Sequence, residues 1–195
     1  MPEITLNDPF GKAMYNTILD YKIYSILEIG AFDGDGSTIV LSEALARKKA
    51  EVSLISLEYT PERFTNLKAN ASKFPFVKPI QASSIGRHSF NAWDFEVDVW
   101  DTPYNGLQYP KEQVRDWHLR DIALMSHTEA GYLDSVPTKG PWDAVLIDGG
   151  EFTGYDEFNL VRNRTRCLFL DDAFSAFKTN RIRRELSSSK DWKLI

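Results

Sequence analysis

The stretch ILEIGAFDGDGST at residues 26–38 decides how this chain folds. Its first half is apolar, as in a strand buried in a parallel sheet, and a turn with glycines at three positions follows. An apolar helical pattern then begins, and Ser37 and Thr38 are the predicted N-cap residues of that helix. Glycine lets the backbone approach a ligand closely, and a helix start offers free N–H donors. The stretch therefore predicts a strand, turn and helix that cradle a nucleotide-type ligand.

The spacing of the glycines separates this turn from the dinucleotide pattern GxGxxG, because the second glycine comes four residues after the first. An acid followed by such a turn resembles the first motif of class I S-adenosylmethionine-dependent methyltransferases. The resemblance implies that the turn holds the methionine part of the cofactor. A tight strand-to-helix turn in another α/β protein is the alternative. The cofactor residues that the resemblance implies here are Glu28, Gly30, Phe32, Gly34 and Ser37.

Composition narrows the class of protein. With 195 residues, 43% of them apolar, the chain is long enough for one α/β domain and too apolar to be disordered. A formal net charge of −5 gives no general attraction to nucleic acid, and one cysteine excludes an internal disulfide. There is no apolar run long enough for a membrane span and no signal-peptide pattern. We expect one cytoplasmic domain over residues 1–195.

A second acid follows the next predicted strand, residues 51–57. Glu58 ends this strand, and Thr60 and Pro61 then start a helix. An acid at the tip of the strand beside the glycine turn can accept the ribose hydroxyls. The resemblance assigns that role to Glu58, together with Tyr59, whereas the alternative is a carboxylate that stabilises the helix start.

The third predicted strand, residues 76–80, contains Pro79 and is therefore expected at an edge of the sheet. Ser83 follows it, where the resemblance implies a contact to adenine. Residues 86–140 exceed what the fold needs and are interpreted as a substrate or lid segment. They include a predicted strand at 95–100, a predicted helix at 110–125 and several tryptophans and tyrosines that could stack on a substrate.

Two further strands are predicted at residues 142–148 and 165–170, with a short helix between them. Residues 173–186 are predicted as a helix whose basic side, including Lys178, faces solvent. Residues 191–195 are predicted to begin a sixth strand, so the C-terminal strand hairpin of the fold is expected to be incomplete.

Carboxylates occur at or near the ends of four predicted strands, where parallel strands converge on a ligand crevice. Asp148, Asp171 and Asp172 together suit Mg²⁺, which prefers oxygen ligands. This pattern resembles metal-dependent O-methyltransferases of the catechol and macrolide-sugar types, which implies a cation that activates the attacking hydroxyl. The chain has Glu151 where those families have Lys or His, and Glu151 is a candidate general base alongside Asp148. Alternatively, the Asp pair caps a helix and Asp148 is a turn residue.

The predicted fold is a Rossmann-like α/β three-layer sandwich with a mostly parallel sheet. The predicted function is methyl transfer from S-adenosylmethionine to a hydroxyl of a small molecule, and the resemblance implies assistance by Mg²⁺. A different nucleotide-binding α/β enzyme and a catalytically silent binding subunit are the alternatives. A nucleic-acid substrate is disfavoured because no Asn/Asp-Pro-Pro-aromatic motif occurs, and an exposed sheet edge would favour a homo-oligomer.

Overall fold

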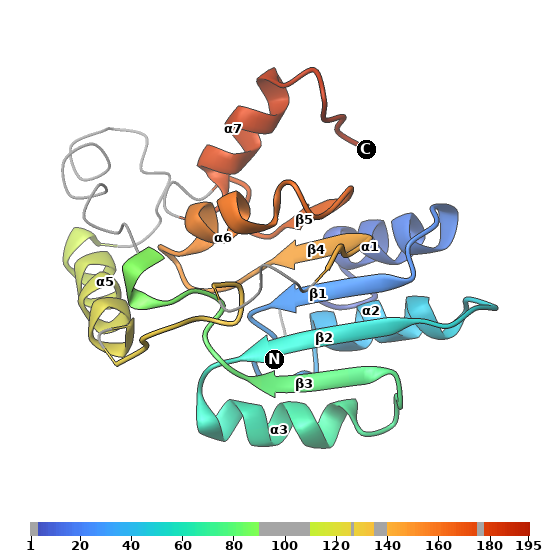
Figure 1. Cartoon of the computed structure of the whole chain (residues 1–195), viewed down its shortest axis with the longest axis horizontal. Coiled ribbons are helices and arrows are strands. Elements are labelled where there is room, and N and C mark those ends of the chain that lie inside the picture. Colours follow the sequence, from blue (N-terminus) through green and yellow to red (C-terminus); the bar gives the residue numbers. More distant parts are fainter. Residues whose placement is uncertain (1–3, 90–109, 126, 135–139, 175–177) are drawn as a thin grey trace.

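A five-stranded parallel sheet forms the centre of the molecule in a computed structural model (Figure 1), which describes residues 4–89, 110–125, 127–134, 140–174 and 178–195. The strand order is β3-β2-β1-β4-β5, and every neighbouring pair is parallel. This confirms the predicted α/β fold. The strands are β1 (Ser25–Ile29), β2 (Ser53–Glu58), β3 (Val77–Gln81), β4 (Ala144–Ile147) and β5 (Leu168–Leu170).

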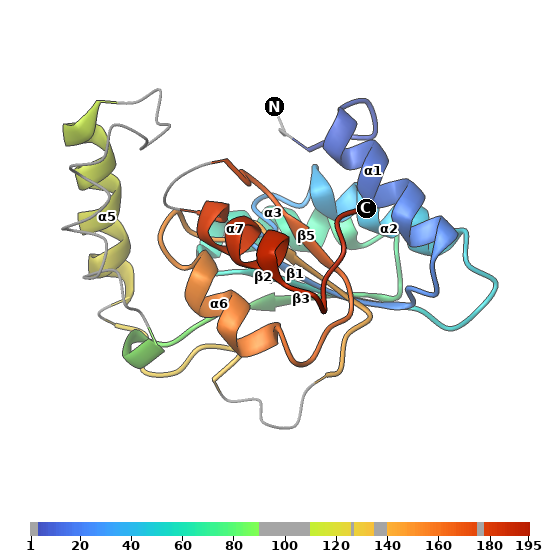
Figure 2. The same cartoon turned by 90° about the horizontal axis from the view of Figure 1, so that it is seen from above.

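Helices cover both faces of the sheet (Figure 2). One apolar core joins α1 and α2 to the sheet, and the other joins the sheet to side chains of α5, α6 and α7. The helix α5 lies beyond the carboxyl ends of the strands (Figure 1). The helices are α1 (Pro9–Asp20), α2 (Ser37–Ala46), α3 (Pro61–Ala71), α5 (Lys111–Met125), α6 (Gly154–Val161) and α7 (Asn180–Ser188), with a short 3₁₀ helix at Arg87–Ser89.

Residues at the ends of the helices and strands explain where most of these elements begin. Asp8 caps α1 by accepting a hydrogen bond from the Gly11 N–H at 2.8 Å. Pro61 opens α3 at its first position, as predicted. The edge position of β3 is also confirmed, since β3 pairs only with β2 among the described strands. The predicted N-cap of α2 is wrong: Gly36 is the N-cap residue, and the hydroxyls of Ser37 and Thr38 donate to Glu28 instead.

The C-terminal part differs most from the prediction. The predicted helix at 173–186 is wrong in its first half, because α7 begins only at Asn180. Lys178 is 7% exposed and does not face solvent, because three carboxylates surround its ammonium group. Residues 191–195 form no strand: they leave α7 with Leu194 and Ile195 exposed and unpaired with β5, so the predicted sixth strand is wrong.

The predicted strand at 95–100 and most of the aromatic residues of the 86–140 segment lie outside the described residues. The predicted helix at 110–125 is confirmed as α5. Within the described part of the chain, every helix is too short or too polar to cross a membrane.

Candidate functional site

The turn after β1 leaves no room for a side chain at two of its glycines. Gly30 has φ +86°, and a Cβ atom there would lie 2.1 Å from the carbonyl oxygen of Asp148. Gly34 has φ +73°, and its Cβ would lie 2.5 Å from Cδ1 of Leu67 in α3. Both positions therefore require glycine. The turn holds the end of β1 against the end of β4 on one side and against α3 on the other.

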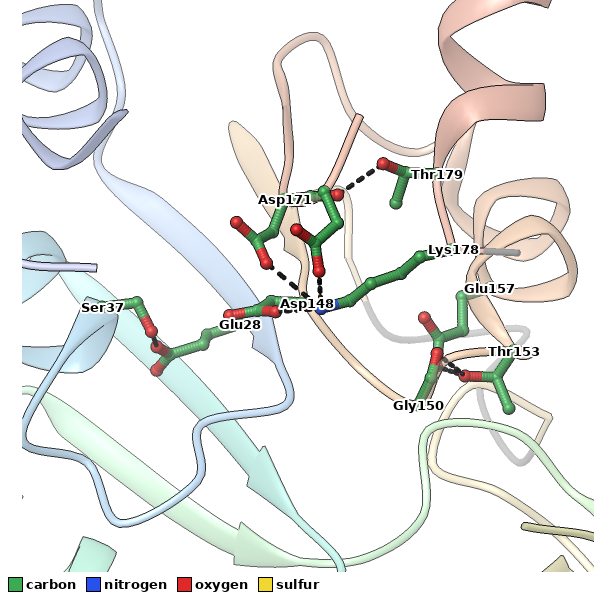
Figure 3. A network of polar contacts seen from close by, with 10 residues as sticks. Glu28, Ser37, Asp148, Gly150, Thr153, Glu157, Asp171, Lys178 and Thr179 are labelled. Carbon is green, nitrogen blue, oxygen red and sulfur yellow. Dashed lines mark hydrogen bonds and ion pairs between the residues drawn. The ribbon is translucent and has the colours of Figure 1, made fainter. Parts of the chain in front are cut away.

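Glu28 lies beneath this turn and is fully buried. Its carboxylate accepts hydrogen bonds from Ser37 Oγ at 2.7 Å, Thr38 Oγ1 at 2.8 Å and Ser56 Oγ at 2.5 Å. Burial raises the pKa of Glu28, and the three hydroxyls oppose that rise. The carboxylate therefore joins β1 and β2 to the start of α2, and Figure 3 shows it directed at Ser37.

A cavity of about 500 Å³ opens at the carboxyl ends of the strands, which is an ordinary size for a small-molecule site. Most of the predicted site residues line it. Glu28 and Gly34 do not, because one is buried below the turn and the other packs on α3. Asp171 and Asp172 are also absent from its wall. The predicted residues that line the cavity are Gly30, Phe32, Ser37, Glu58, Tyr59, Ser83, Asp148 and Glu151.

The wall beside β2 and β3 carries the residues predicted to contact ribose and adenine. Glu58 is 7% exposed, and its Oε1 accepts a hydrogen bond from the Thr60 N–H at 2.7 Å. Ser83 Oγ donates to the carbonyl of Ile85 at 2.7 Å. These bonds fix both side chains at the cavity wall, where their other lone pairs can accept from a ligand.

The carboxylates predicted to bind a metal converge on Lys178 (Figure 3). Its Nζ lies 2.7 Å from Asp148 Oδ1, 3.1 Å from Asp171 Oδ2 and 3.3 Å from Asp172 Oδ2. Burial alone would lower the pKa of Lys178, but Asp148 and Asp171 outweigh it and hold that pKa above its usual value. Lys178 is therefore a cation.

The metal ligands that the sequence predicts do not fit a divalent ion in this arrangement. An ammonium group stands where the three carboxylates meet. Across the described ranges, no group of three or more His, Cys, Asp or Glu side chains is placed to hold a metal. The structure thus gives the predicted metal site of Asp148, Asp171 and Asp172 no support. Sequence reasoning missed Lys178 because the predicted helix begins at residue 173, seven residues before α7, and places Lys178 on its basic, solvated side.

Asp121 of α5 is a second residue that sequence reasoning missed. It lines the cavity together with Glu151, and its Oδ2 is buried with no hydrogen-bond partner among the described residues. Burial raises the pKa of Asp121 to about 6, Glu151 adds to the rise and Arg120 opposes it. A signal existed: Asp121 is an acid at helical spacing from Trp117 and Met125 on the predicted apolar face of the helix.

Glu157 of α6 supports the cavity from below. It is fully buried and accepts hydrogen bonds from Ser84 Oγ at 2.5 Å and Thr153 Oγ1 at 2.9 Å. Burial raises the pKa of Glu157, while Ser84 and Thr153 oppose the rise. This contact, drawn in part in Figure 3, ties the loop after β3 to the start of α6.

Comparison with known proteins finds solved structures of the same fold. No family model matches the chain, and neither does any curated protein. Among solved structures, the O-methyltransferase TomG of Streptomyces achromogenes, in complex with S-adenosylmethionine, is similar over 97% of this chain and 73% of its own, at 16% identity and a TM-score of 0.54. An O-methyltransferase of Bacillus cereus, in complex with S-adenosylhomocysteine, matches over 97% and 73% at 13% identity and a TM-score of 0.55. The chain therefore has the Rossmann-like fold of these class I S-adenosylmethionine-dependent O-methyltransferases.

Proposed function

We propose that the protein transfers a methyl group from S-adenosylmethionine to a hydroxyl oxygen of a small molecule. The observation that carries this proposal is the cavity whose wall joins Gly30, where the turn after β1 has no side chain, to a buried acid, Glu58, at the tip of the adjacent strand. The absence of a side chain at Gly30 lets the methionine part approach the backbone closely, and the acid accepts ribose hydroxyls. The O-methyltransferases with the same fold were solved with this cofactor or its product bound.

The cofactor residues follow from position along the cavity wall. Gly30 and Phe32 lie in the turn after β1 and Ser37 lies at the start of α2, and the methionine part is proposed to bind beside them. Glu58 and Tyr59 are assigned to the ribose, and Ser83 to adenine. Asp148, at the tip of β4, is assigned to the boundary between cofactor and acceptor. Glu28 and Gly34 act indirectly in this proposal, by holding the turn in shape.

The reaction needs an acceptor oxygen in line with the transferred methyl group, which is mainly a matter of positioning. When bound, S-adenosylmethionine supplies an electrophilic methyl carbon whose bond to sulfur breaks as the new bond to oxygen forms. The chain must take up the proton that the acceptor hydroxyl loses. Asp121 and Glu151 line the cavity as carboxylates, and we assign them that role. A pKa of about 6 leaves Asp121 ionised at neutral pH and more basic than an ordinary aspartate.

Magnesium assistance is the part of the prediction that the described residues favour least. All three predicted ligands already form ion pairs with the Lys178 ammonium group. A divalent ion would have to displace that ammonium before it could bind. The proposed reaction is therefore routed through protein carboxylates alone.

We propose a single domain over residues 1–195, with residues 86–140 contributing the acceptor side of the cavity through Asp121 and Leu124 of α5. The single cysteine supports a reducing, cytoplasmic setting.

Calorimetric titration with S-adenosylhomocysteine tests the proposal. We expect stoichiometric binding that Glu58→Ala weakens more than about tenfold, because two ribose hydrogen bonds are lost. Glu62→Ala is the matched control, since Glu62 is an exposed acid in the first turn of α3. No binding by the unaltered protein would overturn the proposal. Tighter binding of a dinucleotide would favour another nucleotide enzyme, and binding without turnover of hydroxylated compounds would favour a silent subunit.

A further inference from the structure

We infer that Lys178 is a built-in cation that takes the place of a divalent metal, so that this site accepts lone hydroxyl groups and does not require acceptors that chelate a metal through two neighbouring oxygens. The part about acceptors rests on the proposed function. The part about the metal stands by itself, because it concerns only the residues around Lys178.

The ammonium group occupies the point where the carboxylates converge. Asp148 from the end of β4 and the pair Asp171 and Asp172 after β5 all place an oxygen within 3.3 Å of Lys178 Nζ. Lys178 and Asp148 both line the cavity, so one side of the cluster forms part of its wall, although Asp171 and Asp172 do not. A metal ion at this point would overlap the ammonium nitrogen.

The backbone of Lys178 is held on two sides. Thr179, fully buried, donates its hydroxyl to the carbonyl of Asp171. Gly154, at the start of α6, packs against the Lys178 carbonyl so closely that a Cβ would lie 2.7 Å from it. These contacts fix the backbone of Lys178, so its side chain starts from a defined position close to the carboxylates.

The number of N–H donors on the ammonium group limits how many oxygens Lys178 can bind. A lysine ammonium has three N–H donors, and in this cluster three carboxylates accept from them. No donor is left to hold an acceptor oxygen. A Mg²⁺ ion, by contrast, keeps coordination positions for substrate oxygens after binding protein ligands. The site consequently orders its carboxylates without offering two adjacent positions to a substrate.

This difference predicts the acceptor class. An enzyme that binds its acceptor through a metal favours two neighbouring oxygens, as in a vicinal diol. With Lys178 in place of the metal, a second neighbouring oxygen gives no additional bond to the cluster. The acceptor hydroxyl then loses its proton to a carboxylate of the cavity wall, and its oxygen forms a bond to the methyl carbon of the cofactor as the bond from that carbon to sulfur breaks, which leaves S-adenosylhomocysteine.

Metal binding is measured first, on the full chain and without substrates, by the electron paramagnetic resonance signal of free Mn²⁺. We expect no stoichiometric Mn²⁺ site in the unaltered protein. Lys178→Ala should gain one site and bind Mn²⁺ more than about tenfold tighter than the unaltered protein does, because three carboxylates lose their cation. Asp171→Asn in the Lys178→Ala background should remove it. Lys190→Ala is the control, since Lys190 is an exposed lysine beyond α7.

A stoichiometric Mn²⁺ site in the unaltered protein that Asp171→Asn removes would overturn the inference, and this result needs no lysine variant to fold. A folded Lys178→Ala protein that gains no site would overturn it as well. The second measurement compares methyl transfer to monohydroxyl and vicinal-diol acceptors with and without EDTA. Rates within about twofold in all four cases support the inference; a diol preference abolished by EDTA contradicts it. If S-adenosylhomocysteine does not bind at all, the proposed function fails while the Mn²⁺ result still decides the role of Lys178.

Discussion

Replacing Asp121 by asparagine should stabilise the fold at neutral pH and leave its stability unchanged in acid. The Oδ2 atom of Asp121 is buried, and none of the described residues donates a hydrogen bond to it. Burial raises the pKa of this carboxyl to about 6 from its ordinary value of 3.8. Asparagine has nearly the same shape and carries no charge, so the variant removes the cost of burying the ionised group.

The sign and size of the effect follow from the two pKa values. Between pH 3.8 and 6 the unfolded chain ionises Asp121 while the folded chain keeps it protonated, so the stability of the natural protein falls as pH rises through that window. Above pH 6 the loss is complete and constant. The shift corresponds to at most about 3 kcal/mol, and because the side chain is only partly buried we expect about 1–3 kcal/mol.

Urea unfolding at several pH values measures this difference directly. The free energy of unfolding of Asp121→Asn, minus that of the natural protein, should rise from near zero at pH 4 to a plateau above pH 6. Asp116→Asn is the matched control, because Asp116 is exposed on the same helix. A difference that does not vary with pH, or one that matches the control, would refute the reasoning. The same variant should lose methyl transfer if Asp121 accepts the proton. The natural protein would then keep a destabilising carboxylate at this position because the reaction requires it.

Three further substitutions test contacts that hold the strands of the sheet and the glycine turn in place. Gly30→Ala should lower the free energy of unfolding by more than about 2 kcal/mol in a urea titration, because its Cβ would meet the Asp148 carbonyl and φ is +86°; unchanged stability would contradict the packing described. Glu28→Ala should cost about 3 kcal/mol or more by the same assay, since three hydroxyls lose their acceptor, and a loss below 1 kcal/mol would argue against that network. Asp143→Asn should remove a stabilisation present above pH 3.8 and lost in acid. Burial by itself would raise the pKa of Asp143, but hydrogen bonds from the backbone N–H groups of Tyr24 and Ser25 lower it; thermal unfolding should therefore show a smaller difference between variant and natural protein at pH 2.5 than at pH 7.

The sheet and the glycine turn could be predicted because their signals are local. An apolar run, three glycines and a helix start specify β1 and its turn without reference to the rest of the chain. The same holds for Glu58, which stands at a strand end followed by a proline that opens a helix. Strand order then brings these features together, because consecutive parallel strands place their carboxyl ends at one edge.

The roles of individual charged side chains could not be predicted in the same way. Glu28 lies one residue from the apolar end of its strand, and only the folded structure shows that hydroxyls from α2 and β2 occupy its carboxylate. Lys178 has the surroundings of a surface lysine in the sequence, yet in the structure it is buried and its ammonium group lies among three carboxylates. Residues 191–195 have the composition of a strand, but pairing depends on a neighbour that the pattern does not specify.

The contact of Gly30 with the Asp148 carbonyl has a thermodynamic consequence. It leaves no space between the end of β1 and the end of β4, so neither can move without displacing the other. One of these ends forms the proposed methionine cradle and the other bears the carboxylate that adjoins the acceptor. A ligand that shifts one of them must therefore change the free energy of binding at the other, and linkage makes that effect reciprocal. Cofactor and acceptor should accordingly alter each other's dissociation constants by the same factor.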